Sequence, residues 1–436
     1  SGSAVAYFDD LALNGKIGNY TLTFESSTLA SATQSISVAH GAATSLTVSV
    51  PASAVNNQGI TDVVVRVLDQ DLNLVTTGTP SISLAGSSSE LTGTLVRNAS
   101  QGIATFPGLK FIGEIGSKNV TAAASSLSLT SLTSTVNLTY GVATQMVLST
   151  SASGAVNRMT FTTPAVVTLK DISGNTVLDS SATVTVSESS NAVALSGTAA
   201  RTPSSGVVTF AALGLNGTVG SYTLTYSSSG LTDITQTINL THGAATKIDI
   251  VATAATARSG QVFGTQPSVR ILDVDNNLVS TGDSSTAIIT AALTGVSDPS
   301  SVTLNGTVAV AAVGGELTFA GLGLTGTAGN YTIAYSSPGL TSADQSIALL
   351  AGTPTAINII TGPSNAVAGA GFGSAVSVEL RDASNNRVLS DSTTDITATL
   401  VSSSDVSSRA VSTTIVRVTN GVANFSSLNY TLAGDH

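Results

Sequence analysis

Hydrophobic and polar residues alternate along much of the chain, which is the pattern of strands with one buried face. One set of runs places Val, Ile or Leu between mostly polar or charged neighbours: Val63–Val67, Val269–Ile271 and Val376–Leu380. A second set places aromatic or aliphatic residues between mostly Thr neighbours: Tyr20–Phe24, Tyr222–Tyr226 and Tyr331–Tyr335. Asn-Gly pairs between the runs favour tight turns with positive φ, at Asn14-Gly15, Asn216-Gly217, Asn305-Gly306 and Asn420-Gly421. No segment keeps a helical period, so the pattern predicts an all-β protein.

The same landmarks recur in the same order along the chain. A Gly-x-Ala-Thr or Gly-x-Pro-Thr step begins at Gly41, Gly141, Gly243 and Gly352, so one period is roughly 100 residues long. An Asp follows each step at a nearly fixed distance, at Asp69, Asp171, Asp273 and Asp382. A Phe comes next, at Phe106, Phe210, Phe319 and Phe425, and Phe8 holds the same place at the start of the chain. The chain is therefore a tandem array of one unit.

Each repeat has the size and turn spacing of an immunoglobulin-like sandwich, with about 100 residues and roughly seven short strands. The stretch from Gly15 to Tyr20 resembles a tyrosine corner, although Val120 stands where the Tyr of the next repeat would fall. The predicted fold class is all-β, with tandem immunoglobulin-like β-sandwich domains in an elongated rod. The predicted domains are 44–143, 144–245 and 246–354, with 1–43 the C-terminal part of one further domain and 355–436 the N-terminal part of another.

Three segments of the third repeat carry a family resemblance: Val269–Val279, Gly315–Leu324 and Gly329–Ile333. They resemble the bacterial immunoglobulin-like tandem repeats of large invasin- and adhesin-type surface proteins, and the similarity covers essentially the whole chain. The same modules occur in filament and surface-layer proteins. The resemblance implies an extracellular or cell-surface stalk or fibre, and it implies this more strongly than any particular binding activity.

Short linkers predict that the rod is stiff. The run Gln236–Thr241 reaches the next run, Lys247–Val251, through only His-Gly-Ala-Ala-Thr. Such a linker allows little swing between domains. Strands of about ten residues at about 3.3 Å per residue suggest about 35 Å per repeat and about 150 Å in all.

The two ends of the chain are complementary parts of one repeat. Residues 1–40 are the late part of a unit, and Gly352 to His436 is the early part. One interpretation is a window of a longer continuous array. The other is head-to-tail association, in which the strands of one chain complete the open sandwich of the next by strand addition.

Composition narrows the classes of partner. Only 9% of the 436 residues are charged, whereas Ser and Thr number 127. The net charge of −10 argues against a nucleic-acid partner. No run of 18 apolar residues exists that could span a membrane as a helix, in spite of a mean hydropathy of +0.36. Few charges protect the strand edges, so the expected partner is the chain itself, head to tail and also laterally.

Catalytic residue types are scarce. Cys is absent, so no thiol nucleophile and no disulfide can form. His40 and His242 occupy the same repeat position, which Tyr140 and Ala351 hold elsewhere, and His436 is terminal. We expect no enzyme, no catalytic residue and no cofactor apart from a calcium ion.

The Asp that follows each linker is the first residue of the one candidate type of metal site, which occurs in two repeats. Asp69, Asp71 and Asn73 lie within five residues, as do Asp273, Asp275 and Asn277. Closely spaced carboxylate and amide oxygens are the ligands that Ca²⁺ prefers. The alternative is a hairpin loop whose Asp and Asn side chains cap their own backbone.

Asn-x-Ser/Thr sequences offer candidate glycosylation sites. We single out six: Asn19, Asn137, Asn216, Asn239, Asn305 and Asn330. Sugars at these places would cover a weakly charged surface.

The sequence therefore predicts an extracellular structural protein that forms a stiff rod, filament or sheath from head-to-tail repeats. One alternative is the stalk or binding module of a cell-surface adhesin that recognises a glycan or a host protein. Another is a surface-layer subunit.

Overall fold

The computed structural model describes residues 5–86, 90–296, 298, 301–364, 372–399, 414–426 and 428, so His436 and part of the predicted domain 355–436 lie outside the described residues. The described regular structure is β-strand, except for the short 3-10 helices Ser125–Leu127 and Asp283–Thr286. The prediction of an all-β fold is confirmed. The chain divides into two compact units, one of residues 1–155, 160–214 and 221–238, the other of residues 156–159, 215–220 and 239–436.

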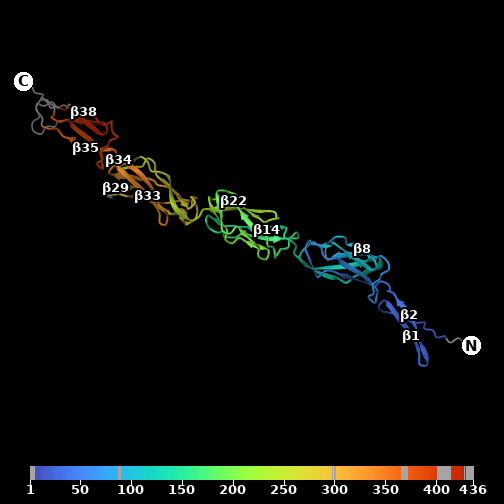
Figure 1. Ribbon diagram of the computed structural model, residues 1–436. Helices are drawn as coiled ribbons and strands as arrows, with labels where there is room; N and C mark the ends of the chain where they lie inside the picture. Colours follow the sequence, from blue (N-terminus) through green and yellow to red (C-terminus); the bar gives the residue numbers. More distant parts are fainter. Residues whose placement is uncertain are drawn as a thin grey trace, which may run out of the picture. The chain divides into compact units, whose positions relative to one another are not determined.

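The first unit begins with a hairpin of two strands, β1 (Gly18–Ser26) and β2 (Leu29–Val38), labelled in Figure 1. Tyr20 lies opposite Ile36 and Phe24 opposite Ala32. The rings of Phe8 and Phe24 lie 5.6 Å apart between centroids. The equivalent rings of two later repeats, Phe210–Tyr226 and Phe319–Tyr335, lie 5.7 and 5.5 Å apart.

Two sheets and a strand pair follow in the first repeat. One sheet has the order β3 (Ser45–Ser49), β5 (Val63–Leu68), β9 (Ile103–Phe106). The other has the order β4 (Ser53–Val55), β13 (Ser134–Thr139), β11 (Gly116–Ala124), β6 (Ser81–Gly86), β8 (Val96–Asn98), with β12 (Leu129–Thr130) beside β11. β7 (Leu91–Thr92) pairs with β10 (Lys110–Phe111).

The second repeat is built on the same plan. Its smaller sheet has the order β14 (Gln145–Thr150), β16 (Val166–Lys170), β20 (Val207–Thr209). Its larger sheet has the order β15 (Ala155–Val156), β23 (Ile234–Thr241), β22 (Gly220–Ser227), β17 (Val184–Ser187), β19 (Ala200–Arg201). β18 (Val193–Ser196) pairs with β21 (Gly214–Gly217).

The second unit holds the third repeat and the last one. The third repeat has three sheets. The first has the order β24 (Ala245–Ala252), β27 (Ser268–Asp273), β31 (Glu316–Thr318), and the second has the order β25 (Ala257–Arg258), β34 (Ala343–Leu350), β33 (Gly329–Ser336), β28 (Ile288–Thr294), β30 (Ala309–Ala311). The third sheet has the order β26 (Gln261–Val262), β32 (Gly323–Gly326), β29 (Val302–Asn305). The last has β35 (Pro354–Thr361), β36 (Val376–Asp382), β39 (Val422–Phe425), and the pair β37 (Asp395–Ala398), β38 (Thr414–Arg417).

In the first and third repeats, alternating residues of the two main sheets meet in one core, which makes each of these repeats a sandwich. Val63, Val65 and Val67 of β5 are at most 1% exposed and share a cluster with Val120 of β11 and Val136 of β13. In the third repeat, Ile271 of β27 shares a cluster with Ile333 and Tyr335 of β33. The immunoglobulin-like sandwich predicted from the repeat length and the turn spacing is confirmed.

Candidate functional site: the Asp loops and their joints

Each repeat has one loop that begins with the landmark Asp and ends with Asn four residues later. The loops are Asp69–Asn73, Asp171–Asn175, Asp273–Asn277 and Asp382–Asn386. The Asp backbone N–H donates to the Asn carbonyl in each loop, at 2.9 to 3.0 Å. The fourth loop residue has positive φ, at Leu72, Gly174, Asn276 and Asn385. The N–H of this left-handed residue donates to the Asp carbonyl, so the loop is a tight hydrogen-bonded turn.

The landmark carboxylate is buried and surrounded by N–H donors. Asp273 is 0% exposed. Its Oδ1 accepts hydrogen bonds from the backbone N–H groups of Asp275 and Asn277, both at 2.9 Å. Its Oδ2 accepts from the Gly243 N–H at 2.8 Å and from the amides of Asn157 and Asn277 at 2.9 Å. Burial alone would raise the pKa of Asp273, but these bonds favour its charged form and lower the pKa.

The three other landmark carboxylates bind their own loop and linker in the same way. Gly41, Gly141 and Gly352 donate their backbone N–H groups to Asp69, Asp171 and Asp382. The Gly of the linker motif and the landmark Asp, which lie about 30 residues apart in the sequence, are therefore hydrogen-bonded partners. The alternative in which Asp and Asn cap backbone groups describes these contacts.

The last Asn of each loop binds a turn of the preceding repeat. The Asn277 amide donates to the Gly217 carbonyl at 2.9 Å, and its Oδ1 accepts from the Val219 N–H at 2.9 Å. We call each set of contacts between an Asp loop and the preceding repeat a joint. The other Asn residues bind equivalent turns: Asn73 with Gly15 and Ile17 (joint 1), Asn175 with Gly113 and Ile115 (joint 2), Asn386 with Gly326 and Ala328 (joint 4); Asn277 forms joint 3. Joints 1 and 2 lie within the first unit, and joints 3 and 4 within the second.

Three joints contain a further polar side chain that the sequence analysis missed. The Asn56 amide donates to Asp171 at 2.8 Å, and the Asn157 amide donates to Asp273 at 2.9 Å. Their Oδ1 atoms accept the N–H groups of Gly113 and Gly217. Asn56 and Asn157 are 1% and 2% exposed. Their spacing matches the period of the repeat and is the signal that could have identified them. Ser259 takes this place in joint 4.

Close packing within the joints requires the linker glycines Gly141 and Gly352. A Cβ on Gly141 would lie 2.5 Å from the Asn56 carbonyl oxygen, and a Cβ on Gly352 would lie 2.2 Å from the Ser259 carbonyl oxygen. No side chain fits at such distances, so the N–H of glycine alone can approach the carboxylate here.

The tyrosine corner supports the turn that enters the joint. The Tyr20 hydroxyl donates to the Lys16 carbonyl, and the Tyr331 hydroxyl donates to the Thr327 carbonyl, both at 2.6 Å. Lys16 and Thr327 are the middle residues of the turns that bind the loop Asn in joints 1 and 4. The corner predicted from the Gly15–Tyr20 stretch is confirmed.

The structure brings each trio of candidate calcium ligands together, but it surrounds their oxygens with donors. Asp275 receives a bidentate contact from Arg158, at 2.6 and 2.7 Å, and the Asn157 amide at 2.8 Å. Asp71 accepts the Gly15 N–H at 3.1 Å. Among the residues that the structure describes, no group of three or more His, Cys, Asp or Glu side chains could hold a metal ion. Calcium at Asp69, Asp71, Asn73, Asp273, Asp275 and Asn277 stays a prediction.

The histidines contact the linker backbone. His40 Nδ1 lies 3.0 Å from the Gly41 carbonyl oxygen, and His242 Nδ1 lies 2.9 Å from the Gly243 carbonyl oxygen. His242 Nε2 also lies 2.8 Å from the Thr281 hydroxyl. Both rings thus occupy equivalent places beside a joint, as their shared repeat position indicated.

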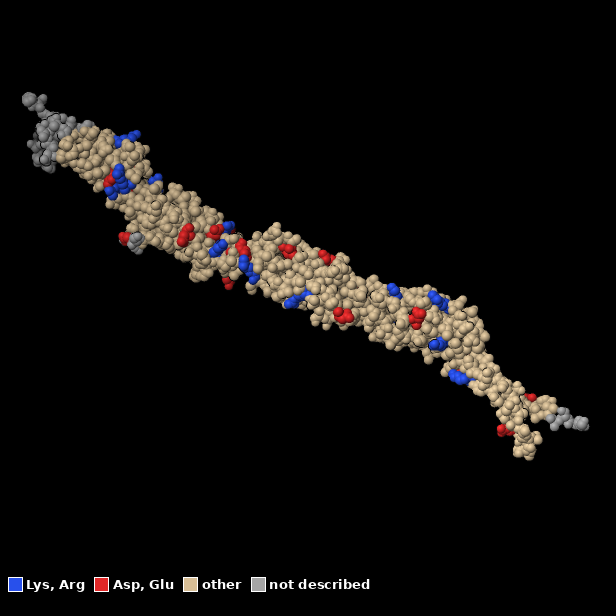
Figure 2. All heavy atoms as spheres, in the orientation of Figure 1, with Lys and Arg blue, Asp and Glu red and all other residues tan. Residues whose placement is uncertain are grey.

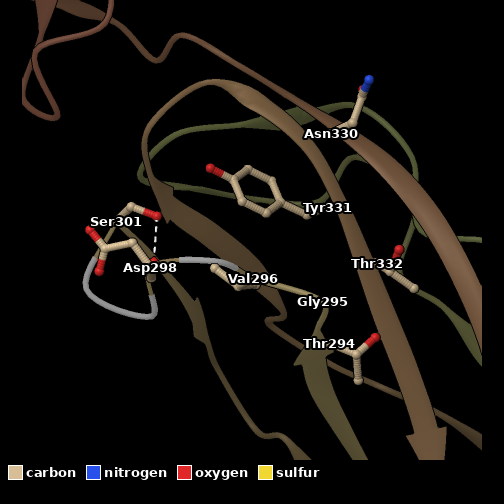
Figure 3. Close-up of a pocket in the computed structure, with 8 residues that line it drawn as sticks. All are labelled: Thr294, Gly295, Val296, Asp298, Ser301, Asn330, Tyr331 and Thr332. Carbon is tan, nitrogen blue, oxygen red and sulfur yellow. Dashed lines mark hydrogen bonds between the residues drawn. The ribbon is translucent and has the colours of Figure 1, made fainter.

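Five of the six candidate glycosylation residues are exposed: Asn19, Asn137, Asn239, Asn305 and Asn330. Asn216 is half-buried in β21, directly before Gly217 of joint 3. A sugar on Asn216 would therefore need the space that the contacts of joint 3 occupy. Asn330 and Tyr331 are among the residues that line a hollow of about 320 Å³, and Figure 3 shows these residues. The lining also includes Ser301, whose hydroxyl donates to the Asp298 carbonyl.

The charged residues are sparse on the surface, as their low share of the sequence predicts. On the face shown in Figure 2, Lys, Arg, Asp and Glu side chains are scattered among mostly uncharged residues. Within the described part of the chain, no helix is long and apolar enough to cross a membrane.

Comparisons with known proteins show only a distant likeness. No protein-family model matches the chain, and no curated protein matches it. A solved structure of surface layer protein SbsC, domains 1–6, is 14% identical, with a TM-score of 0.24; the match covers 98% of this chain but only 58% of that one. The Escherichia coli adhesin FdeC is 14% identical over 72% of this chain and 99% of its own, with a TM-score of 0.35. Titin domains I67–I69 are 9% identical over 72% of this chain and 100% of their own, with a TM-score of 0.27. Scores this low assign no function.

Proposed function

We propose that the chain is a non-enzymatic, extracellular structural protein of a prokaryotic surface, in which consecutive repeats form a stiff rod, filament or sheath. The observation that carries this proposal is the joint, which recurs four times with the same Asp loop, the same Asn contacts and the same turn. A catalytic site has no reason to recur at every linker, whereas a mechanical connection does.

The joints support stiffness because their polar groups are buried and paired. Asp171 is 1% exposed, and it accepts bonds from the linker at Gly141 and from the preceding repeat at Asn56. Bending a joint would separate a buried carboxylate from its donors, and an unpaired buried charge is costly. Only residues 242–244 lie between β23 and β24, so the linker adds little freedom.

Head-to-tail association is the finer part of the proposal, and the third repeat supports it. There, Tyr335 of the β33–β34 hairpin is 0% exposed, and Ile248 of β24 is 4% exposed. The equivalent residues near the two ends of the chain are uncovered: Phe24 of β1 is 39% exposed and Ile357 of β35 is 55% exposed. The hairpin β1–β2 thus has the apolar face that the β35–β36–β39 sheet needs, and the two can meet when they belong to different copies.

Light scattering and negative-stain imaging of the purified full chain test this association. We expect species that grow with concentration as linear chains. Phe24→Glu should reduce the association, because it places a charge on the apolar face of the hairpin. Thr23→Glu is the matched control, since Thr23 lies on the opposite face of the same strand, and it should assemble normally.

The images also separate the alternatives. A wild-type chain that stays monomeric at high concentration would contradict head-to-tail assembly and leave the stalk of an adhesin. Regular two-dimensional arrays would instead identify a surface-layer subunit.

A further inference from the structure

All four joints share one set of contacts, so the differences between them can be compared directly. In each joint the Asn at the end of the loop binds a backbone carbonyl and a backbone N–H of the preceding turn. In joints 2, 3 and 4 the accepting Asn Oδ1 lies 3.1, 2.9 and 2.7 Å from the N–H nitrogens of Ile115, Val219 and Ala328. These three backbone groups lie at equivalent places, and each must lose its acceptor when its joint opens.

Joint 3 has the most charged contacts in addition to this shared set. The Asn157 amide donates to Asp273 and to Asp275. Arg158, the next residue, forms a bidentate ion pair with Asp275. Bidentate guanidinium–carboxylate pairs are strong and fix the relative direction of the two groups.

Joint 2 has an intermediate set. The Asn56 amide donates to the Asp171 carboxylate at 2.8 Å and lies 2.9 Å from the Ser173 hydroxyl. Ser173 stands where joint 3 has Asp275, so this joint has one charged acceptor where joint 3 has two.

Joint 4 replaces the bridging Asn by a shorter side chain. The Ser259 hydroxyl oxygen accepts the Gly326 N–H at 3.0 Å and lies 2.9 Å from the Ser384 hydroxyl. Among the described residues, the donors to Asp382 come from its own loop and from Gly352 of the linker. The bridging side chain of the preceding repeat therefore meets a neutral hydroxyl in place of the buried carboxylate. Arg258 donates to the Ser390 hydroxyl and the Ala351 carbonyl, at 3.2 and 3.3 Å.

We infer that joints 2, 3 and 4 are graded in strength and that joint 4, between repeats 246–354 and 355–436, is the weakest of the three. Hydrogen bonds to charged groups are stronger than those between neutral groups. Joint 3 therefore opens least often, joint 2 more often, and joint 4 most often. In the proposed rod, joint 4 is a position that bends easily, and this mechanical role rests on the proposed function. The order of joint strengths does not depend on it.

Hydrogen exchange of the full chain tests the order, with the backbone N–H groups of Ile115, Val219 and Ala328 as reporters. After correction for intrinsic exchange rates, we expect protection to fall from Val219 to Ile115 to Ala328, with Ala328 exchanging about tenfold faster than Val219. Equal protection, or the reverse order, would overturn the inference. Hydrogen exchange at these N–H groups reports the opening of the joints whether or not the chain assembles. This result is therefore independent of the assembly experiment.

Two variants exchange the chemistry of the joints. Ser259→Asn should slow exchange at Ala328, because the amide can reach Asp382. Arg158→Met should speed exchange at Val219, because it removes the ion pair but leaves Asn157 in place. The backbone N–H groups of Leu169, Ile271 and Leu380, which donate within the three repeats that flank joints 3 and 4, should keep their protection in both variants. If Ala328 does not respond to Ser259→Asn while these core groups stay protected, the bridging side chain does not set the strength of the joint.

Discussion

At the scale of single residues, Gly141 shows why the linker step begins with glycine. Its conformation is open to other residues, since its φ is not in the left-handed region. What excludes a side chain is the Asn56 carbonyl oxygen, 2.5 Å from the place of a Cβ. A Cβ on Gly41, at the same step of the first repeat, would lie 3.7 Å from its nearest neighbour, Asp69 Oδ2.

The two glycines give a matched pair of substitutions. Gly141→Ala should lower the free energy of unfolding of its flanking repeats by about 1–3 kcal/mol, because the backbone of Asn56 must move. Gly41→Ala should be close to neutral, because its Cβ would make only an ordinary van der Waals contact. Denaturant unfolding with both variants measures the difference. Equal effects of the two substitutions would mean that the close approach to Asn56 does not decide the choice of glycine.

Sequence reasoning identified the loop residues but not their partners. Asp273, Asp275 and Asn277 could be recognised because their oxygens cluster within five residues. Whether a cation or N–H groups meet those oxygens depends on Asn157, which lies in the preceding repeat. A lone Asn near a strand end has no local pattern, and Ser259 interrupts the period at the third occurrence.

At the scale of elements, alternation predicted the strands well because each complete repeat buries one face of each main sheet. The Asn-Gly pairs were less reliable. Asn420-Gly421 forms a turn in which both residues have positive φ, as predicted. Asn216-Gly217 instead ends strand β21, where the φ of 142° at Gly217 lets the chain enter joint 3. Turn propensity is local, whereas the joint that recruits this Gly is a tertiary contact.

The loop of joint 3 should make stability depend on pH in a defined window. The hydrogen bond from Arg158 lowers the pKa of Asp275 to about 2. An unfolded Asp has a pKa of about 3.9, so the folded state binds its proton less readily. The stabilisation is therefore complete above about pH 5 and is lost as the pH falls from about 4 towards 2.

Comparison of the wild type with Asp275→Asn isolates this group from the other carboxylates that titrate in the same range. At pH 7 the variant should be less stable by no more than about 1 kcal/mol, because Arg158 is 52% exposed and solvent screens the pair. The gap in melting temperature should close as the pH approaches 2. A gap that stays constant from pH 7 to pH 2 would show that the charge of Asp275 contributes nothing to the joint.

At the scale of the whole molecule, the contacts follow a serial pattern. Each joint uses one Asp loop and one turn, and the first and third repeats each have their own core. The buried landmark carboxylates Asp171, Asp273 and Asp382 each accept several hydrogen bonds within their own joint. This serial pattern supports the rod proposed above.

X-ray scattering by the monomeric chain tests that conclusion. A compact chain of this length would have a radius of gyration of about 22 Å. A thin rod of the predicted length of about 150 Å has one of about 43 Å, its length divided by the square root of twelve. The Phe24→Glu variant is the sample of choice, because head-to-tail association would inflate the value. We expect a radius near the larger figure, with Ser259→Asn shifting it slightly upwards if joint 4 bends in solution. A radius near the smaller figure would contradict the rod, since the joints would then not hold the repeats in line.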